Sequence, residues 1–182
     1  MKRRVVMFDV DGVLADFLTA YRAQEQKFGM KVTFEPRWNA YWNDEVWAAI
    51  KTIPDWWIKV PAIPDMPTFL RIADLTYAHD LYFVTNRTGV DVKTQTERWL
   101  RMRGVLQPTV ILSKKKGEMA AAIGADFAID DKAGNALYTA WHSPKTKSFI
   151  LDAPWNQFDH DVAGGGVTRV KTVDQFLDEV IL

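Results

Sequence analysis

Short apolar runs alternate along most of the chain with segments that mix apolar and charged residues. Runs of β-branched or apolar residues cover residues 5–9, 81–85, 109–112, 127–130 and 148–151, and residues 167–170 (VTRV) form a further, more polar candidate. Unbroken apolar runs of this length are typical of strands in a parallel sheet, because both faces of such a sheet are covered. The runs therefore predict six strands.

The segments between these runs predict helices. Residues 68–77, 117–123, 133–141 and 173–181 have helical patterns, and residues 91–103 carry apolar side chains among charges, as an amphipathic helix does. The apolar positions of that last segment are Val92, Trp99, Leu100 and Met102. Strands that alternate with helices predict an α/β fold with a parallel, doubly wound sheet flanked by helices.

The first two strands are separated by far more chain than one crossover helix needs. Residues 68–77 supply that helix, so residues 18–62 form an insertion, which ends at the proline-rich "VPAIPDMP". Five of the eight tryptophans lie between residues 38 and 57, which indicates an aromatic subdomain. Ligands bind at the carboxyl ends of the strands in open α/β sheets. We therefore predict a catalytic core of residues 1–17 and 63–182, with residues 18–62 as a small helical cap.

Composition removes several classes of function. The chain has 182 residues, no cysteine and a net charge of zero, so disulfides and thiolate chemistry are excluded and no charge pattern favours nucleic acid or a membrane as partner. The apolar run near the N-terminus is shorter than the roughly 7–15 residues of a secretory signal. No segment reaches the roughly 18 apolar residues of a membrane span. We expect a cytoplasmic protein.

Polar residues follow four of the predicted strands at the edge where ligands bind. They are Asp9, Asp11 and Gly12; Thr85, Asn86 and Arg87; Ser113 and the lysines at 114–116; and Asp130 with Asp131. Carboxylates gathered at one edge repel each other unless a cation lies between them, and a set of oxygen ligands suits Mg²⁺. Each motif alone is explained by a turn or a helix cap. Their order at successive strand ends favours a site for Mg²⁺ and a phosphate.

These motifs resemble those of the haloacid dehalogenase-like (HAD) hydrolases. "DVDGVLADF" is similar to the first motif of that superfamily, and Thr85, a lysine at 114–116 and "IDD" at 129–131 follow in the family's order. Within the superfamily the chain is most similar to the 5′(3′)-deoxyribonucleotidases. That similarity lies in "DGVLADF", "IPDWWIKVPAIPDMPTFLRIADL", "ERWLRMRGV" and "LDAPWNQ". The chain departs from the animal members in "TNR", where they have Thr-Ser-Pro, in two tryptophans in place of two phenylalanines, and in a longer spacing from the lysine to the Asp pair.

The resemblance implies a HAD-like Rossmannoid core and a role for each motif residue. Asp9 would be the nucleophile, and Asp11 would protonate the leaving oxygen and later deprotonate water. Mg²⁺ would be held by Asp9, the backbone carbonyl of Asp11 and Asp131, with Asp130 as neighbour or alternate ligand. The phosphate would contact Thr85, Asn86 and Lys116, with Lys114 as the alternate lysine. The substrate would contact Phe17, Trp56, Trp57 and Arg87.

The aromatic insertion leaves several further contacts open. Trp38, Tyr41 and Trp42 are additional candidates for the base or sugar, whereas Trp47 is expected to pack in the core. Arg87 has three alternatives, namely contact with the phosphate, contact with the base, or solvent. Asp16 is read as a helix cap in preference to a site residue.

The predicted activity is Mg²⁺-dependent hydrolysis of nucleoside monophosphates, with deoxypyrimidine 5′-nucleotides as the first choice, through an aspartyl-phosphate. The partner is a small phosphate monoester, and a homodimer is left open. Two alternatives remain. One is a HAD phosphatase for another small ester or a polynucleotide end, and the other is a non-catalytic protein of the same fold.

Overall fold

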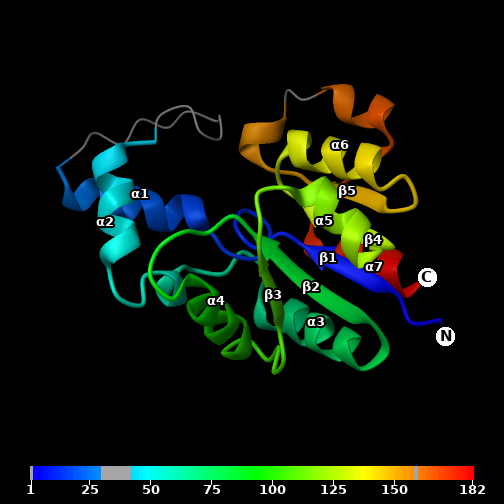
Figure 1. The fold of residues 1–182 in the computed structure, drawn as a ribbon, viewed down its shortest axis with the longest axis horizontal. Helices are drawn as coiled ribbons and strands as arrows, with labels where there is room; N and C mark the ends of the chain where they lie inside the picture. Colours follow the sequence, from blue (N-terminus) through cyan, green and yellow to red (C-terminus); the bar gives the residue numbers. More distant parts are fainter. Residues whose placement is uncertain (1, 30–41, 158–159) are drawn as a thin grey trace.

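A six-stranded sheet, parallel throughout, forms the centre of the protein (Figure 1). The computed structural model describes residues 2–29, 42–157 and 160–182. The strands are β1 (Val5–Phe8), β2 (Asp80–Thr85), β3 (Thr109–Leu112), β4 (Phe127–Asp130), β5 (Lys147–Leu151) and β6 (Val167–Val170). Their order is β3-β2-β1-β4-β5-β6. The chain thus adds β2 and β3 on one side of β1 and then β4, β5 and β6 on the other side. A crevice at such a change of side is where ligands bind in open α/β sheets.

Helices cover both faces of the sheet, because alternate strand residues point to opposite sides. On one face, Val6 and Phe8 of β1 join a large apolar cluster with α3 (Met66–Ala78), α4 (Val92–Arg101) and α7 (Val173–Ile181). On the other face, Met7 packs with α5 (Lys116–Ile123), and α6 (Ala133–His142) covers β5. Two 3₁₀ helices, η2 (Pro154–Asn156) and η3 (His160–Gly165), lie between β5 and β6.

The predicted α/β fold is confirmed, and each predicted strand and helix is present within a residue or two of its expected bounds. One assignment is wrong. Met102 was placed on the apolar stripe of residues 91–103, but its side chain is 63% exposed. Met102 is the C-cap residue directly after Arg101, the last residue of the helix.

Between β1 and α3 the chain forms α1 (Phe17–Lys27), α2 (Asp44–Thr52) and the 3₁₀ helix η1 (Trp57–Lys59). Figure 1 shows α1 and α2 beyond the end of the sheet toward which the strand arrows point, while both termini lie at the opposite end. Asp16 caps α1, as predicted, by accepting the backbone N–H of Thr19 at 3.1 Å. Asn43 caps α2 in the same way through the N–H groups of Glu45 and Val46.

The two ends of this insertion are fastened together by backbone hydrogen bonds. Ala15 and Ala62 form an antiparallel bridge. The N–H of Asp16 donates to Pro61, and the N–H of Ile63 donates to Leu14, both at 2.8 Å. The insertion therefore leaves the core and returns to it at one place, directly beside the end of β1.

The apolar residues of the insertion continue the core of the sheet. Tyr21, Val46, Ile50 and Trp57, with Phe17 directly before the insertion, belong to the same buried cluster as Phe8 and Phe83. Two of the predicted aromatic contacts, Trp38 and Tyr41, lie outside the described residues. Among the helices that the structure describes, none has the length and apolar character needed to cross a membrane.

Candidate active site

A tight turn after β1 brings the first motif to the carboxyl edge of the sheet. The N–H groups of Leu14 and Ala15 both donate to the carbonyl of Val10, at 2.9 and 2.7 Å. Gly12 has φ +87° in this turn, a conformation that side chains disfavour. A Cβ at this position would lie 2.3 Å from Oδ2 of Asp131, so only glycine lets the turn approach the fourth motif.

Three carboxylates from two neighbouring strands meet at this edge. Asp9 follows β1, Asp130 ends β4 and Asp131 follows it, and one oxygen of each lies within 4.8 Å of the others. All three side chains are buried. The parallel pairing of β1 with β4 brings the carboxyl ends of these strands side by side, which is why the motifs meet.

Lys116 binds this acidic cluster from the start of α5. Its Nζ lies 2.7 Å from Oδ1 of Asp9 and 3.3 Å from Oδ2 of Asp130. The same Nζ donates to the carbonyl of Val84 at 2.6 Å, which fixes it against the end of β2. Of the two lysines that the sequence left open, Lys116 makes these contacts, whereas Lys114 is exposed at the border of the adjoining cavity.

The electrostatics of the cluster show an excess of negative charge. Burial raises the pKa of Asp9 to about 7; the charge of Lys116 opposes this, and the charges of Asp130 and Asp11 add to it. Burial, followed by the charges of Asp130 and Asp9, raises the pKa of Asp131 well above its usual range. Burial lowers the pKa of Lys116, but the charges of Asp9 and Asp130 outweigh this effect and raise it overall. Lys116 therefore offsets only part of the repulsion, and a cation would offset more.

Asp131 is held so that one of its oxygens remains available. Its Oδ2 accepts the indole N–H of Trp155 at 2.9 Å, and its backbone carbonyl accepts the side-chain amide of Asn156 at 2.8 Å. Its Oδ1 is buried and has no hydrogen-bond partner among the described residues. A buried carboxylate oxygen without a donor is costly unless something else binds it. The cluster of Asp9, Asp130 and Asp131 thus fits a hard divalent cation such as Mg²⁺.

Asp11, the second carboxylate of the first motif, makes a different set of contacts. Oδ2 of Asp11 accepts the hydroxyl of Thr85 at 3.1 Å, and its Oδ1 accepts Nη2 of Arg87 at 2.8 Å. Thr85 ends β2 and is fully buried, and Asn86 beside it is exposed. Asp11, Thr85 and Arg87 therefore form a second hydrogen-bonded group at this edge, in addition to that of Asp9 and Lys116.

A cavity of about 580 Å³ opens in front of these residues. Its polar wall comprises Asp9, Asp11, Thr85, Asn86, Arg87, Lys114, Lys116, Lys132 and Asn135, and its aromatic wall comprises Phe17, Trp42, Trp47 and Trp57. Trp42, Trp47 and Trp57 come from the insertion, Phe17 directly precedes it, and the polar residues lie near the carboxyl edge of the sheet. The cavity thus combines charged and polar residues with an aromatic wall.

The aromatic wall is itself a packed cluster. The ring of Phe17 lies nearly parallel to the rings of Trp47 and Trp57, with centroids 5.5 and 5.8 Å away. Trp42 meets Phe17 edge-on at 5.4 Å. Trp56 is buried against Trp57 and is not among the described residues that border the cavity.

Sequence reasoning missed four residues of this site. Trp47 was expected only to pack, yet it also borders the cavity, as does Lys132. Asn135 donates to both oxygens of Asp130 at 3.0 and 3.2 Å, and Trp155 binds Asp131. Asn135 lies in the first turn of α6, directly after the Asp pair, and that position was a usable signal. Trp155 lies in "LDAPWNQ", a segment recognised only as a similarity.

Solved structures with the same architecture are hydrolases of the HAD-like class. A haloacid dehalogenase-like hydrolase of Burkholderia xenovorans has a TM-score of 0.64 at 13% identity over 100% of both chains. A HAD-hydrolase of Bacillus subtilis, bound to magnesium, has a TM-score of 0.61 at 15% identity over 100% of both chains. A D,D-heptose 1,7-bisphosphate phosphatase of B. bronchiseptica, complexed with magnesium and phosphate, has a TM-score of 0.55 at 14% identity over 98% of each chain. The fold is therefore that of the HAD-like hydrolases.

The sequence itself places the chain more narrowly. Residues 3–171 match the family described as 5′ nucleotidase, deoxy (Pyrimidine), cytosolic type C protein, and the chain belongs to this family. Among curated proteins, none matches the chain. The protein is thus a HAD-like phosphatase, a phosphoric monoester hydrolase.

Proposed function

We propose that the protein hydrolyses nucleoside monophosphates, deoxypyrimidine 5′-nucleotides first among them, with Mg²⁺ as cofactor and Asp9 as nucleophile. One observation carries the proposal. The carboxylate of Asp9, held by Lys116 beside a buried acidic cluster, borders the same cavity as an aromatic wall. The family supports a pyrimidine deoxynucleotide and a cytosolic location.

The contacts of Asp9 favour one of its oxygens for attack. Its Oδ1 accepts the N–H of Val10 at 2.6 Å and binds Lys116 at 2.7 Å. We therefore assign the attack on phosphorus to Oδ2. A bond forms between Oδ2 and phosphorus as the bond from phosphorus to the ester oxygen breaks, and the result is an aspartyl-phosphate.

Asp11 acts as the general acid in the first half of the reaction and as the general base in the second. It gives a proton to the departing ester oxygen in the first half. In the second half, water attacks phosphorus, Asp11 takes a proton from that water, and the bond to Oδ2 of Asp9 breaks, which releases inorganic phosphate. The free carboxylate of Asp9 and protonated Asp11 are then restored for the next substrate.

The remaining polar residues would bind the phosphate and stabilise its negative charge. The hydroxyl of Thr85, the backbone of Asn86 and Nζ of Lys116 would contact the phosphate oxygens, with Lys116 offsetting the charge that develops on them. The residues that would hold Mg²⁺ are Asp9, Asp130 and Asp131 with the backbone carbonyl of Asp11. Bound there, Mg²⁺ supplies neutralisation of the phosphate's negative charge, which lets an anionic carboxylate approach it.

The insertion of residues 18–62 would act as the cap that selects the substrate. Its Trp42 and Trp47 are partly exposed and border the cavity, so they suit a planar base, and Phe17 and Trp57 support them. Stacking on an aromatic side chain contributes about 1–3 kcal/mol per base. A sugar phosphate without a base would leave this wall unused.

Phosphate release from a substrate panel tests the proposal. The panel contains all ribo- and deoxyribonucleoside 5′- and 3′-monophosphates, several sugar phosphates and an aryl phosphate, each with Mg²⁺ and with EDTA. Asp9→Asn removes the nucleophile, and Asp74→Asn, at an exposed aspartate of α3, is the matched control. We expect selective, Mg²⁺-dependent turnover of deoxynucleotides that Asp9→Asn abolishes and Asp74→Asn retains. Turnover of sugar phosphates alone would contradict the nucleotide assignment, and full activity of Asp9→Asn would contradict the mechanism.

A further inference from the structure

Arg87 is a buried cation at the border of the active site, and each of its three guanidinium nitrogens donates to a protein atom. Nε donates to both oxygens of Asp11 at 3.1 and 3.0 Å, and Nη2 donates to Oδ1 of Asp11 at 2.8 Å. Nη1 donates to the hydroxyl of Thr96 at 3.1 Å. The Arg87 side chain is 0% exposed, whereas that of Asp11 is 15% exposed. Arg87 borders the cavity, but its side chain is buried, so a substrate would meet the partly exposed Asp11 first.

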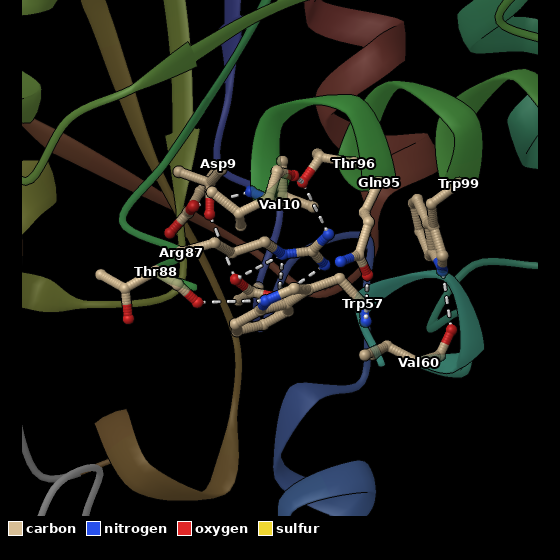
Figure 2. A network of polar contacts seen from close by, with 12 residues as sticks. Asp9, Val10, Trp57, Val60, Arg87, Thr88, Gln95, Thr96 and Trp99 are labelled. Atoms are coloured by element: carbon tan, nitrogen blue, oxygen red, sulfur yellow. Dashed lines mark hydrogen bonds and ion pairs between the residues drawn. The ribbon is translucent and has the colours of Figure 1, made fainter. Parts of the chain in front are cut away.

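Arg87 is itself fixed by parts of the chain that are distant in sequence. Its guanidinium lies 4.7 Å from the ring centroid of Trp57, which belongs to η1 in the insertion (Figure 2). The indole N–H of Trp57 donates to the carbonyl of Thr88 at 3.2 Å, and its backbone N–H donates to Gln95 at 3.0 Å. The loop after β2, the start of α4 and the insertion thus hold the guanidinium in one orientation.

The geometry of this contact requires arginine. Nε and Nη2 bind one carboxylate side by side, and the flat guanidinium stacks on an indole at the same time. A lysine has a single donor group and no plane, so it satisfies only part of this arrangement. Such a paired contact fixes the rotation of the Asp11 carboxylate as well as its position.

We propose that Arg87 is a positioning residue, which holds the Asp11 carboxylate at the cavity wall beside Thr85 and does not contact the substrate. The proposal rests on the proposed function, since it takes Asp11 as the group that gives and takes the proton. It replaces the phosphate or base contact expected of Arg87 from the sequence with an action through Asp11. It also links the insertion to the catalytic proton, because Trp57 lies against the guanidinium.

A double-mutant cycle distinguishes positioning from a structural role. Loss of a general acid lowers kcat by about 10²- to 10⁴-fold, which is the expectation for Asp11→Asn. We expect Arg87→Met to lower kcat at least tenfold and to leave KM within threefold. In the Asp11→Asn background we expect Arg87→Met to lower kcat less than twofold, because there is no longer a carboxylate to position. Arg87→Lys should recover part of the loss.

Arg103 provides the matched control. It is a second arginine of the same cluster, stacked 3.7 Å from the ring centroid of Trp99 and bonded to the carbonyl of Trp99 at 2.9 Å. Arg103→Met should lower kcat by the same factor whether or not Asp11 is present. Urea unfolding of each variant shows which proteins are folded, and Arg87→Lys replaces Arg87→Met if the latter does not fold.

Equal losses from Arg87→Met in both backgrounds would overturn the proposal, and so would a tenfold rise in KM with unchanged kcat, the result expected of a substrate contact. If the wild-type protein hydrolyses no substrate, the proposed function fails, and crystal structures decide the positioning separately. We expect the Asp11 carboxylate to leave Thr85 in Arg87→Met, or in Arg87→Lys if that variant is used. An unchanged Asp11 conformation in that structure would refute the inference whatever the activity.

Discussion

The bond from Trp155 to Asp131 leads to a measurable prediction about metal affinity. The variant Trp155→Phe keeps an aromatic ring but loses the indole N–H that binds Oδ2 of Asp131 at 2.9 Å. That bond fixes the carboxylate in the orientation that leaves Oδ1 without a hydrogen-bond donor beside Asp9 and Asp130. Without it the carboxylate is free to turn, so the cluster must be reordered when Mg²⁺ binds.

The expected size of the effect follows from the kind of bond. A buried hydrogen bond to a charged group contributes about 1.5–3 kcal/mol, and each 1.4 kcal/mol is a factor of about ten in a binding constant. We therefore expect the Kd for Mg²⁺ to rise about 10- to 100-fold, which is also the usual effect of removing a partner of a metal ligand.

Isothermal titration of the full chain with Mg²⁺ measures this directly and needs no substrate. Trp141→Phe is the control, since Trp141 lies on α6 with 65% of its surface exposed. Unfolding in urea with EDTA shows whether Trp155→Phe is folded before the metal is added. A Kd for folded Trp155→Phe within twofold of the wild type would refute the role assigned to this bond.

Three further outcomes are expected. Gly12→Ala should abolish Mg²⁺ binding in the same titration, because its Cβ would lie 2.3 Å from Oδ2 of Asp131; wild-type affinity would show that the turn can open. Trp47→Ala should raise KM for nucleotides about 5- to 150-fold, the equivalent of about 1–3 kcal/mol of stacking. KM for a phosphate ester without an aromatic group should stay unchanged, and an equal rise for both substrates would argue against contact with the base. Burial, then the charge of Arg4, lowers the pKa of His79, so the folded state favours neutral His79, and its contribution to stability is present above pH 6.5 and is lost as pH falls. The urea midpoint should therefore fall more between pH 7.5 and 5.5 in the wild type than in His79→Asn, and parallel slopes would contradict this.

The strands and the motif residues were predictable because each carries a local signal. Residues 5–9 are an apolar run that ends in a carboxylate, and parallel pairing of β1 with β4 then brings Asp9 to Asp131 without further information. The lysine of the site was narrowed by the motif order to residues 114–116, and its contacts with Asp9 and Asp130 then identify Lys116. The period of the apolar residues and a residue's position in its strand or helix are enough to predict its role when that role depends on this element alone.

The contacts between side chains were not predictable in this way. Nothing in "TNR" indicates that Arg87 points at Asp11 and away from solvent, because this depends on Thr96 and Trp57, which are distant in the chain. Helical spacing marks Trp47 as a packed residue, and it does pack on Phe17, but spacing does not reveal that the same ring borders a cavity. These roles depend on contacts between segments that are distant in the sequence, and the local pattern of a single sequence does not predict such contacts.

The bridge between Ala15 and Ala62 has a consequence for how this enzyme can change. Since the insertion starts and ends at one fastened point, its length can grow at a cost in loop closure that rises only slowly with the number of residues. An exchange of the segment between these two alanines would leave Asp9, Lys116 and Asp131 anchored in the sheet. Under the proposed function, a foreign segment grafted at this joint would change substrate selection and keep the hydrolytic residues of the sheet, provided that it retains Trp57 against Arg87.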